Sequence, residues 1–145
     1  MTLHTHHGRC HCGNIDYDFV TSHDVAELTP RRCGCSYCRK LPARHLADPA
    51  GELHIRYQDE TRVGRYRFGQ KTADFVFCAT CGVPPFVLCE TEGRLYGVLN
   101  GNTLDDAARL AEPQGLHDFD GEGSGDRLER RKKNWIGKVT INSSQ

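Results

Sequence analysis

The sequence predicts a mainly β fold with one short helix, and three observations lead to this prediction. Short segments alternate apolar and polar residues with a period of two, which is typical of half-buried strands. Glycine and proline separate these segments at short intervals. Only one stretch has both the composition and the flanking residues of a helix. The 145 residues fit one compact domain, 1–145.

The strands are predicted from this alternation. In residues 14–20 it is strict, with Ile15, Tyr17 and Phe19 on one face and aspartates on the other. Another predicted strand runs directly into Cys78, and Gly82 follows the next cysteine, which is typical of a metal-binding turn at the tip of a hairpin. The further predicted strands cover residues 52–56, 63–68, 74–77, 85–89, 94–100 and 135–141.

The helix is predicted over residues 104–111. Asn102 or Thr103 could cap its start, and Pro113 would end it. A glycine-rich loop is predicted over residues 121–125. A basic run from Arg127 to Lys133 follows, which would be either a solvated face or a nucleic-acid contact.

Composition excludes some classes of function and indicates how the fold is stabilised. Lysine plus arginine and aspartate plus glutamate both number 19, so the formal charge is zero, which argues against overall attraction to nucleic acid or membranes. No segment has the apolar length of a membrane span, and the start of the chain lacks a signal-peptide pattern. We therefore expect a cytoplasmic protein. Apolar residues make up only 37% of the chain, so we expect metal ions to reinforce a modest core.

Seven of the eight cysteines form three tight clusters whose spacing indicates zinc. Two of the clusters are pairs that border strands, and together they would close a structural site with four thiolates. The middle cluster would bind a second ion and leave one position open for water or substrate. The alternatives are disulfides and redox thiols, which a reducing compartment disfavours. The ligand sets are Cys10, Cys12, Cys78 and Cys81 for the first ion, and Cys33, Cys35 and Cys38 for the second.

The middle cluster lies in a basic segment. Residues 31–45 contain five arginine or lysine residues and no acidic residue. Such a segment could bind the carboxylates of an anionic ligand, or simply offset the charge of the thiolates. The five residues are Arg31, Arg32, Arg39, Lys40 and Arg44. We take Arg32, Arg39 and Lys40 as the candidate substrate-binding residues.

Three motifs resemble the glutathione-dependent formaldehyde-activating enzymes and the related centromere protein V. These motifs are Arg9-Cys-His-Cys-Gly13, Cys33-Gly-Cys-Ser-Tyr-Cys-Arg-Lys40 and Phe77-Cys-Ala-Thr-Cys-Gly82. The segments Asn102–Asp106 and Phe119–Gly121 also match, so the resemblance covers roughly residues 8 to 121. An insertion that is not typical of the family separates Gly121 from Trp135.

This resemblance implies twisted antiparallel sheets of the β-tent type that carry two zinc ions. The first and third motifs would hold the structural ion, and Cys33, Cys35 and Cys38 would form the catalytic site. The implied activity is that of a carbon–sulfur lyase, which condenses formaldehyde with glutathione to give S-hydroxymethylglutathione. A small thiol and a small carbonyl compound would then be its partners.

Two other functions are compatible with the sequence. A non-catalytic zinc module could bind protein or nucleic acid through the basic run. A methionine sulfoxide reductase of the B type would need a reactive cysteine outside the metal sites, and only Cys89 is spare.

We expect Cys89 and Trp135 to be buried, and His11 to be a solvent-facing spacer. His45 and His54 are possible acid–base groups, and the terminus with His4, His6 and His7 is expected to be frayed. The sequence does not predict the oligomeric state.

Overall fold

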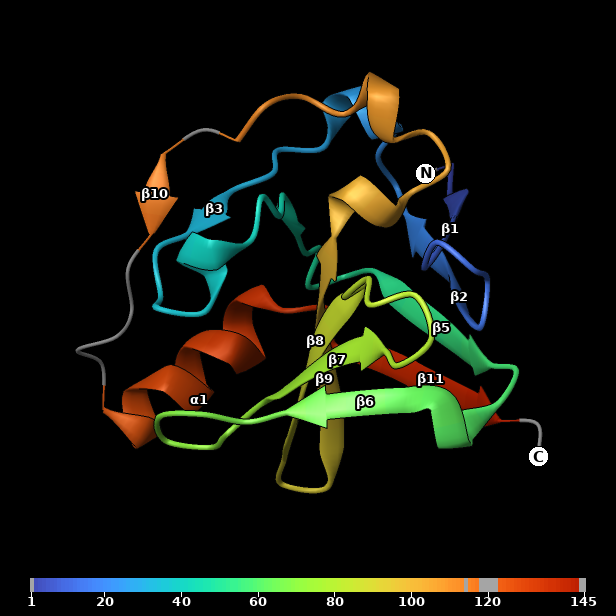
Figure 1. Ribbon diagram of the computed structural model, residues 1–145. Helices are drawn as coiled ribbons and strands as arrows, with labels where there is room; N and C mark the ends of the chain where they lie inside the picture. Colours follow the sequence, from blue (N-terminus) through green and yellow to red (C-terminus); the bar gives the residue numbers. More distant parts are fainter. Residues whose placement is uncertain (1, 114, 118–122, 144–145) are drawn as a thin grey trace.

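The fold consists of two main β-sheets and one α-helix (Figure 1). The computed structural model describes residues 2–113, 115–117 and 123–143. The first sheet has the strand order β1-β2-β5-β11, and its first three strands are antiparallel neighbours. The last strand is parallel to β5. These strands are β1 (His4–Arg9), β2 (Ile15–Thr21), β5 (Glu52–Tyr57) and β11 (Lys138–Ser143).

The second sheet has five antiparallel strands in the order β4-β9-β8-β7-β6. They are β4 (His45–Leu46), β6 (Val63–Tyr66), β7 (Asp74–Cys78), β8 (Phe86–Thr91) and β9 (Arg94–Asn100). A short parallel pair joins β3 (Arg32–Cys33) to β10 (Leu116–His117). The prediction of a mainly β fold is confirmed.

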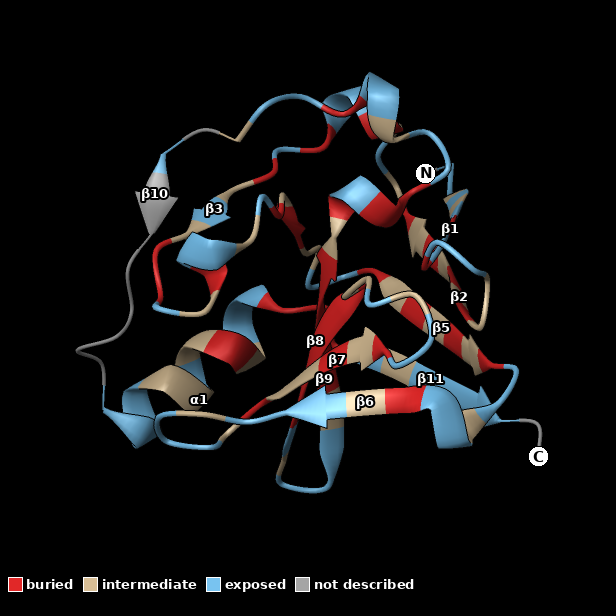
Figure 2. Cartoon of the chain, viewed as in Figure 1, coloured by how far each residue is buried: buried red, intermediate tan, exposed pale blue. Residues whose placement is uncertain are grey.

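The core lies on both faces of the second sheet. Phe86 and Leu88 of β8 point into the main core that the two sheets share. Val87 and Cys89 alternate with them and belong to a smaller core with Trp135. This second core lies beneath α1 (Ser124–Asn134), and β8 is consequently buried along most of its length (Figure 2). Cys89 and Trp135 are therefore buried, as predicted.

The N-terminal segment is not frayed. Residues His4–Arg9 form β1, which pairs with β2 over its whole length. The Nε2 atom of His6 lies 2.8 Å from the carbonyl oxygen of His23, and His7 forms an ion pair with Asp18. The prediction was wrong because β1 contains no apolar residue apart from glycine, and its stability comes from pairing with β2.

The predicted helix over residues 104–111 is also wrong. The segment forms one short 3-10 turn, η5 (Ala107–Arg109), and another such turn, η4 (Gly101–Thr103), directly precedes it. The guanidinium of Arg44 donates to the carbonyl oxygens of Leu110 (2.9 Å) and Ala107 (3.2 Å). In a helix the carbonyl oxygen of Ala107 would accept a hydrogen bond from the backbone N–H four residues later, but here it accepts one from the distant side chain of Arg44. Arg44, one of the five cations beside the middle cysteine cluster, stabilises this segment.

The α-helix instead occupies the end of the predicted glycine-rich loop and the basic run. Ser124 and Gly125 belong to α1, and residues 121–122 lie outside the described residues, as does the Phe119–Gly121 motif. Arginine, lysine, leucine and glutamate have high helix propensity, and together they outweigh the unfavourable effect of the single glycine, Gly125. The predicted strand over residues 135–141 begins later, at Lys138, because Trp135 caps the C-terminal end of α1.

Gly8 allows the β1–β2 hairpin to pack closely against the η4 turn. A Cβ atom there would lie 2.2 Å from the Tyr17 hydroxyl oxygen, which is bonded to the Thr103 hydroxyl at 2.7 Å. We expect Gly8→Ala to lower the free energy of unfolding by about 1–3 kcal/mol, because a buried ring must move. Gly125→Ala is the matched control, since its Cβ meets open space on a helix, and it should stabilise by up to about 1 kcal/mol. Thermal unfolding of both variants tests this, and equal stabilities would contradict it.

Candidate metal centres

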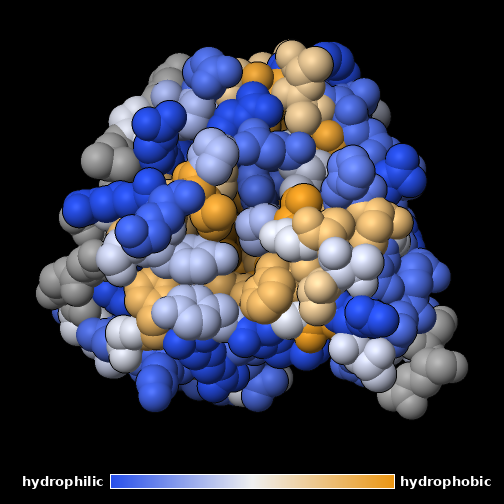
Figure 3. Space-filling model, viewed as in Figure 1, coloured by the Kyte–Doolittle hydropathy of each residue, from blue (hydrophilic) through white to orange (hydrophobic). Residues whose placement is uncertain are grey.

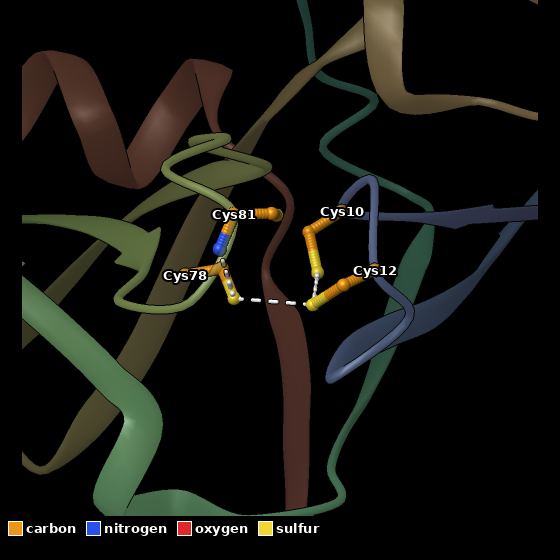
Figure 4. A group of neighbouring side chains, drawn as sticks. All are labelled: Cys10, Cys12, Cys78 and Cys81. Carbon is orange, nitrogen blue, oxygen red and sulfur yellow. Dashed lines mark hydrogen bonds between the residues drawn. The ribbon is translucent and has the colours of Figure 1, made fainter.

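The first candidate metal site joins two turns that are far apart in the sequence. Cys10 and Cys12 lie in the turn between β1 and β2, while Cys78 ends β7 and Cys81 lies in the turn after it (Figure 4). The four sulfur atoms lie within 4.8 Å of one another. Gly13 and Gly82 both have positive φ, at 87° and 83°, so each glycine lets the chain turn past its cysteine pair. The predicted grouping of these four cysteines agrees with the structure.

The spacing of the sulfurs fits a tetrahedral zinc ion. Sulfur ligands about 2.3 Å from zinc are about 3.8 Å apart. The sulfur of Cys12 lies 3.8 Å from that of Cys10 and 3.5 Å from that of Cys78. Backbone N–H groups also donate to two of the sulfurs: that of Ile15 to Cys10 at 3.4 Å, and that of Cys81 to Cys78 at 3.5 Å. Such bonds favour the thiolate form, which is the metal-binding form.

The thiols of this site have different affinities for protons. Burial raises the pKa of Cys10 to about 12. Burial also acts to raise the pKa of Cys81, but backbone N–H donors from Val83 and Cys12 outweigh it and lower that pKa to about 6. Without a cation the four sulfurs would not all be deprotonated together at neutral pH. The donor set therefore fits a bound divalent cation, which would compensate the thiolate charge.

The second candidate site is formed by one continuous stretch of chain. Cys33 ends β3, and Cys38 begins the 3-10 turn η2 (Cys38–Lys40). The backbone N–H of Cys38 donates to the sulfur of Cys35 at 3.3 Å, and the three sulfurs lie within 4.8 Å of one another. Cys35 and Cys38 are buried. The predicted three-sulfur cluster is thus assembled in the structure.

These three thiols share their protons unequally. Hydrogen bonds from Cys33 and Cys38 strongly lower the pKa of Cys35. Contacts with Cys33 and Cys35 raise the pKa of Cys38, and the contact with Cys35 raises the pKa of Cys33. The cluster consequently favours one thiolate, and full deprotonation needs a bound cation. The cluster fits a metal ion by the same argument as the first site.

His45 is the histidine that the structure brings to this cluster. Its Nε2 atom lies 3.5 Å from the sulfur of Cys38. Two backbone hydrogen bonds with Arg31, of 2.8 and 3.0 Å, hold it there. Burial lowers the pKa of His45 to about 4, and the charge of Arg31 acts in the same direction. The sequence offered His45 and His54 equally, but His54 faces Glu52 and Thr140 on the first sheet.

The three-sulfur cluster borders a pocket between β3, the second sheet and α1. Figure 3 shows a hollow in the middle of this face with apolar surface around it. Side chains of three kinds line the pocket. The sulfurs and His45 form one part, arginines form another, and apolar residues together with Thr72 form the rest. The arginines are Arg31, Arg127, Arg130 and Arg131, and the apolar residues are Phe68, Ala73, Phe75, Val87, Val98 and Trp135.

The predicted substrate-binding residues are not among those that line this pocket. Arg32, Arg39 and Lys40 have exposed side chains. Arg31 lines the pocket instead, together with arginines of α1. The sequence did not associate the basic run with the cysteines, because about 90 residues separate them and no periodicity predicts that α1 packs here.

The fold and the two cysteine clusters define a class: a small β protein with one closed four-sulfur site and one three-sulfur site beside a pocket. This chain belongs to the glutathione-dependent formaldehyde-activating enzyme family, whose model matches residues 5–119. A solved structure of a Rhodobacter sphaeroides protein is also similar, with 22% sequence identity and a TM-score of 0.50. The alignment covers 94% of this chain and 99% of that chain, and it supports the fold alone.

Family membership supports an enzymatic function related to glutathione and formaldehyde. All eight cysteines are free thiols in the structure, so the disulfide alternative has no support there. Within the described part of the chain, no helix is long and apolar enough to span a membrane. The helix α1 lies beyond the residues that the family model matches.

Proposed function

We propose that this protein is a zinc-dependent carbon–sulfur lyase that joins formaldehyde to the thiol of glutathione, giving S-hydroxymethylglutathione. One observation carries the proposal: Cys33, Cys35 and Cys38 converge at the wall of a pocket, whereas the other four clustered cysteines do not line it. An ion held there could be reached by a substrate, and three protein ligands leave a position for it. Family membership supports the choice of substrates.

We assign two zinc ions to the chain. Thiolate ligands favour zinc among the common divalent cations. Cys10, Cys12, Cys78 and Cys81 would hold a structural ion, and Cys33, Cys35 and Cys38 would hold the ion of the active site. When bound there, zinc supplies a Lewis acid that lowers the pKa of a substrate thiol.

The residues of the pocket bind and orient the two substrates. Cys33, Cys35 and Cys38 fix the place where the substrate sulfur enters, and Phe68 and Phe75 give the pocket an apolar lining that disfavours water. The sulfur of glutathione then bonds to the carbon of formaldehyde, and the carbonyl π bond breaks. The proton that the thiol loses ends on the new hydroxyl oxygen, so that atoms and charge balance.

The proposal is tested by measuring adduct formation against the spontaneous reaction. The protein reconstituted with two equivalents of zinc is mixed with formaldehyde and glutathione, and exchange NMR gives the rate of adduct formation. We expect a rate well above background that requires both the zinc and the thiol. A fully zinc-loaded protein that leaves the background rate unchanged would rule the function out.

Chelation should empty the two sites in order. Three thiolates hold an ion less tightly than four, so a chelator should first remove the zinc bound by Cys33, Cys35 and Cys38. Activity is expected to disappear with the first equivalent, while circular dichroism keeps the spectrum of the folded protein. Zinc release is followed with a colorimetric indicator. Unfolding in step with the first equivalent would contradict this order.

The alternative, a non-catalytic zinc module that binds protein or nucleic acid, relied on the basic run. Within the described residues, two members of this run are engaged by the fold. Arg131 is buried, and the Nζ atom of Lys132 lies 2.6 Å from Glu92 and 3.0 Å from Glu129. We therefore favour the enzyme. The roles of Arg32, Arg39 and Lys40 in substrate binding, and the cytoplasmic location, stay predictions.

A further inference from the structure

The basic run of α1 forms one wall of the pocket beside the three-sulfur cluster. Arg127, Arg130 and Arg131 line it from the helix, and Arg31 lines it from the segment before β3. Among the described residues, no aspartate or glutamate lines this pocket. Burial lowers the pKa of Arg131, and the nearby charges of Arg130 and Arg127 act in the same direction. Four guanidinium groups are therefore gathered at this pocket.

Two buried N–H groups at the same wall lack an acceptor in the described part of the protein. They are the Nε of Arg131 and the Nε1 of Trp135, and each side chain is only 6% exposed. Other contacts fix both residues in place. Arg131 donates to the Thr72 hydroxyl at 2.7 Å and lies 4.9 Å from the centre of the Trp135 ring. Buried donors normally find an acceptor, so these groups indicate a ligand that brings acceptor oxygens.

Part of the pocket lining is apolar. Phe68, Phe75 and Val98 belong to this part, and the two phenylalanine rings lie 5.1 Å apart. Phe75 also lies 4.7 Å from the ring of Tyr37, which stands between two of the cluster cysteines in the sequence. A ligand that filled the pocket would thus meet sulfur atoms, aromatic carbon and guanidinium groups.

We propose that α1 provides a carboxylate-binding subsite for the substrate of the three-sulfur site. The substrate is then an anionic thiol, held by its carboxylate on Arg127, Arg130 and Arg31 while its sulfur reaches the cluster. This inference rests on the proposed function for the identity of the thiol. Arginine suits the role because its planar donors match a carboxylate. The helix α1 follows residues 5–119, the part of the chain that the family model matches.

The protein contains a reporter for this subsite. Trp135 is its only tryptophan and lines the pocket, so intrinsic fluorescence reports binding there without any measurement of activity. Zinc-loaded protein is titrated with glutathione and with the glutathione diethyl ester, which keeps the thiol but loses both carboxylate charges. We expect glutathione to bind about tenfold more tightly than the ester, since hydrogen bonds to charged groups are the strong ones.

Matched variants separate the subsite from general electrostatics. Arg130→Gln and Arg127→Gln should each weaken glutathione binding about fivefold to tenfold and leave ester binding unchanged. Lys133→Gln removes the same charge from an exposed position of α1 that does not line the pocket, and it should change affinity less than twofold. Thermal unfolding confirms that each variant is folded. If one arginine variant does not fold, the other carries the test.

The outcomes distinguish this inference from the proposed function. Charge-dependent binding that requires Arg127 or Arg130 supports the subsite, even if no adduct with formaldehyde forms. Equal binding of glutathione and its ester, or loss of affinity in Lys133→Gln as large as in the arginine variants, overturns the subsite. If the protein forms the adduct but shows either result that overturns the subsite, the proposed function stands and only the subsite is rejected.

Discussion

Replacing Cys38 by serine is expected to lower the rate of thiol-adduct formation at least about 100-fold. Changing a residue that only supports a metal ligand already lowers metal affinity or activity about 10–100-fold, and Cys38 is itself a proposed ligand. Cys38 is buried, its sulfur belongs to the three-sulfur cluster, and it contacts His45. A serine hydroxyl is a far weaker zinc ligand than a thiolate. The variant should bind one zinc ion instead of two and keep its fold. Activity and zinc content are measured on the same preparation.

Cys89→Ser is the matched control for this experiment. Cys89 is equally buried, but it lies on β8 in the second core and belongs to neither cluster. Its sulfur accepts a hydrogen bond from Arg131 at 3.5 Å, and a serine oxygen could accept the same bond. This variant should retain two zinc ions and nearly full activity. A Cys38→Ser protein with one zinc ion and full activity would show that the cluster is not the active site.

The second large effect is expected from Cys78→Ser at the four-sulfur site. Cys78 is fully buried, and its sulfur faces that of Cys12 across 66 residues of sequence. A structural zinc site contributes about 10–16 kcal/mol of apparent binding energy at neutral pH. Loss of one ligand should therefore remove several kcal/mol, a large fraction of the about 5–15 kcal/mol that stabilises a domain. We expect the variant to be unfolded or to melt far below the wild type.

Two comparisons make this result specific. Cys89→Ser should melt close to the wild type, since it changes a buried cysteine without touching a metal ligand. Added zinc should raise the melting temperature of the wild type and have little effect on Cys78→Ser. A Cys78→Ser protein that melts like the wild type in the presence of a chelator would show that the site does not stabilise the fold.

The sequence predicted most strands and both cysteine sets because these depend on local patterns. The alternation in β2 and the turns that hold Cys10 and Cys81 are set by residues close in sequence. What could not be predicted depends on contacts with other segments of the chain. The strand β1 needs β2, and the conformation of residues 104–111 depends on Arg44, some 60 residues earlier.

The candidate site shows the same division. The three-sulfur cluster is contiguous in sequence, and it was predicted with its complete set of cysteines. The pocket beside it is assembled from the second sheet and from α1, and no spacing rule relates Arg130 to Cys35. The basic run could be recognised in the sequence. Whether it faces solvent or a pocket, however, depends on how Leu128 and Trp135 pack in the second core.

The position of β11 has a consequence for how the protein is made. This last strand completes the first sheet beside β5, but it leaves the ribosome roughly 80 residues after β5, or about 4 to 16 s later at 5–20 residues per second. Until then one edge of β5 is open to pairing with other chains. All four ligands of the closed metal site have been synthesised well before β11. Zinc present during translation could therefore hold the early hairpins together over this interval, and we expect zinc supply at that stage to govern the yield of folded protein.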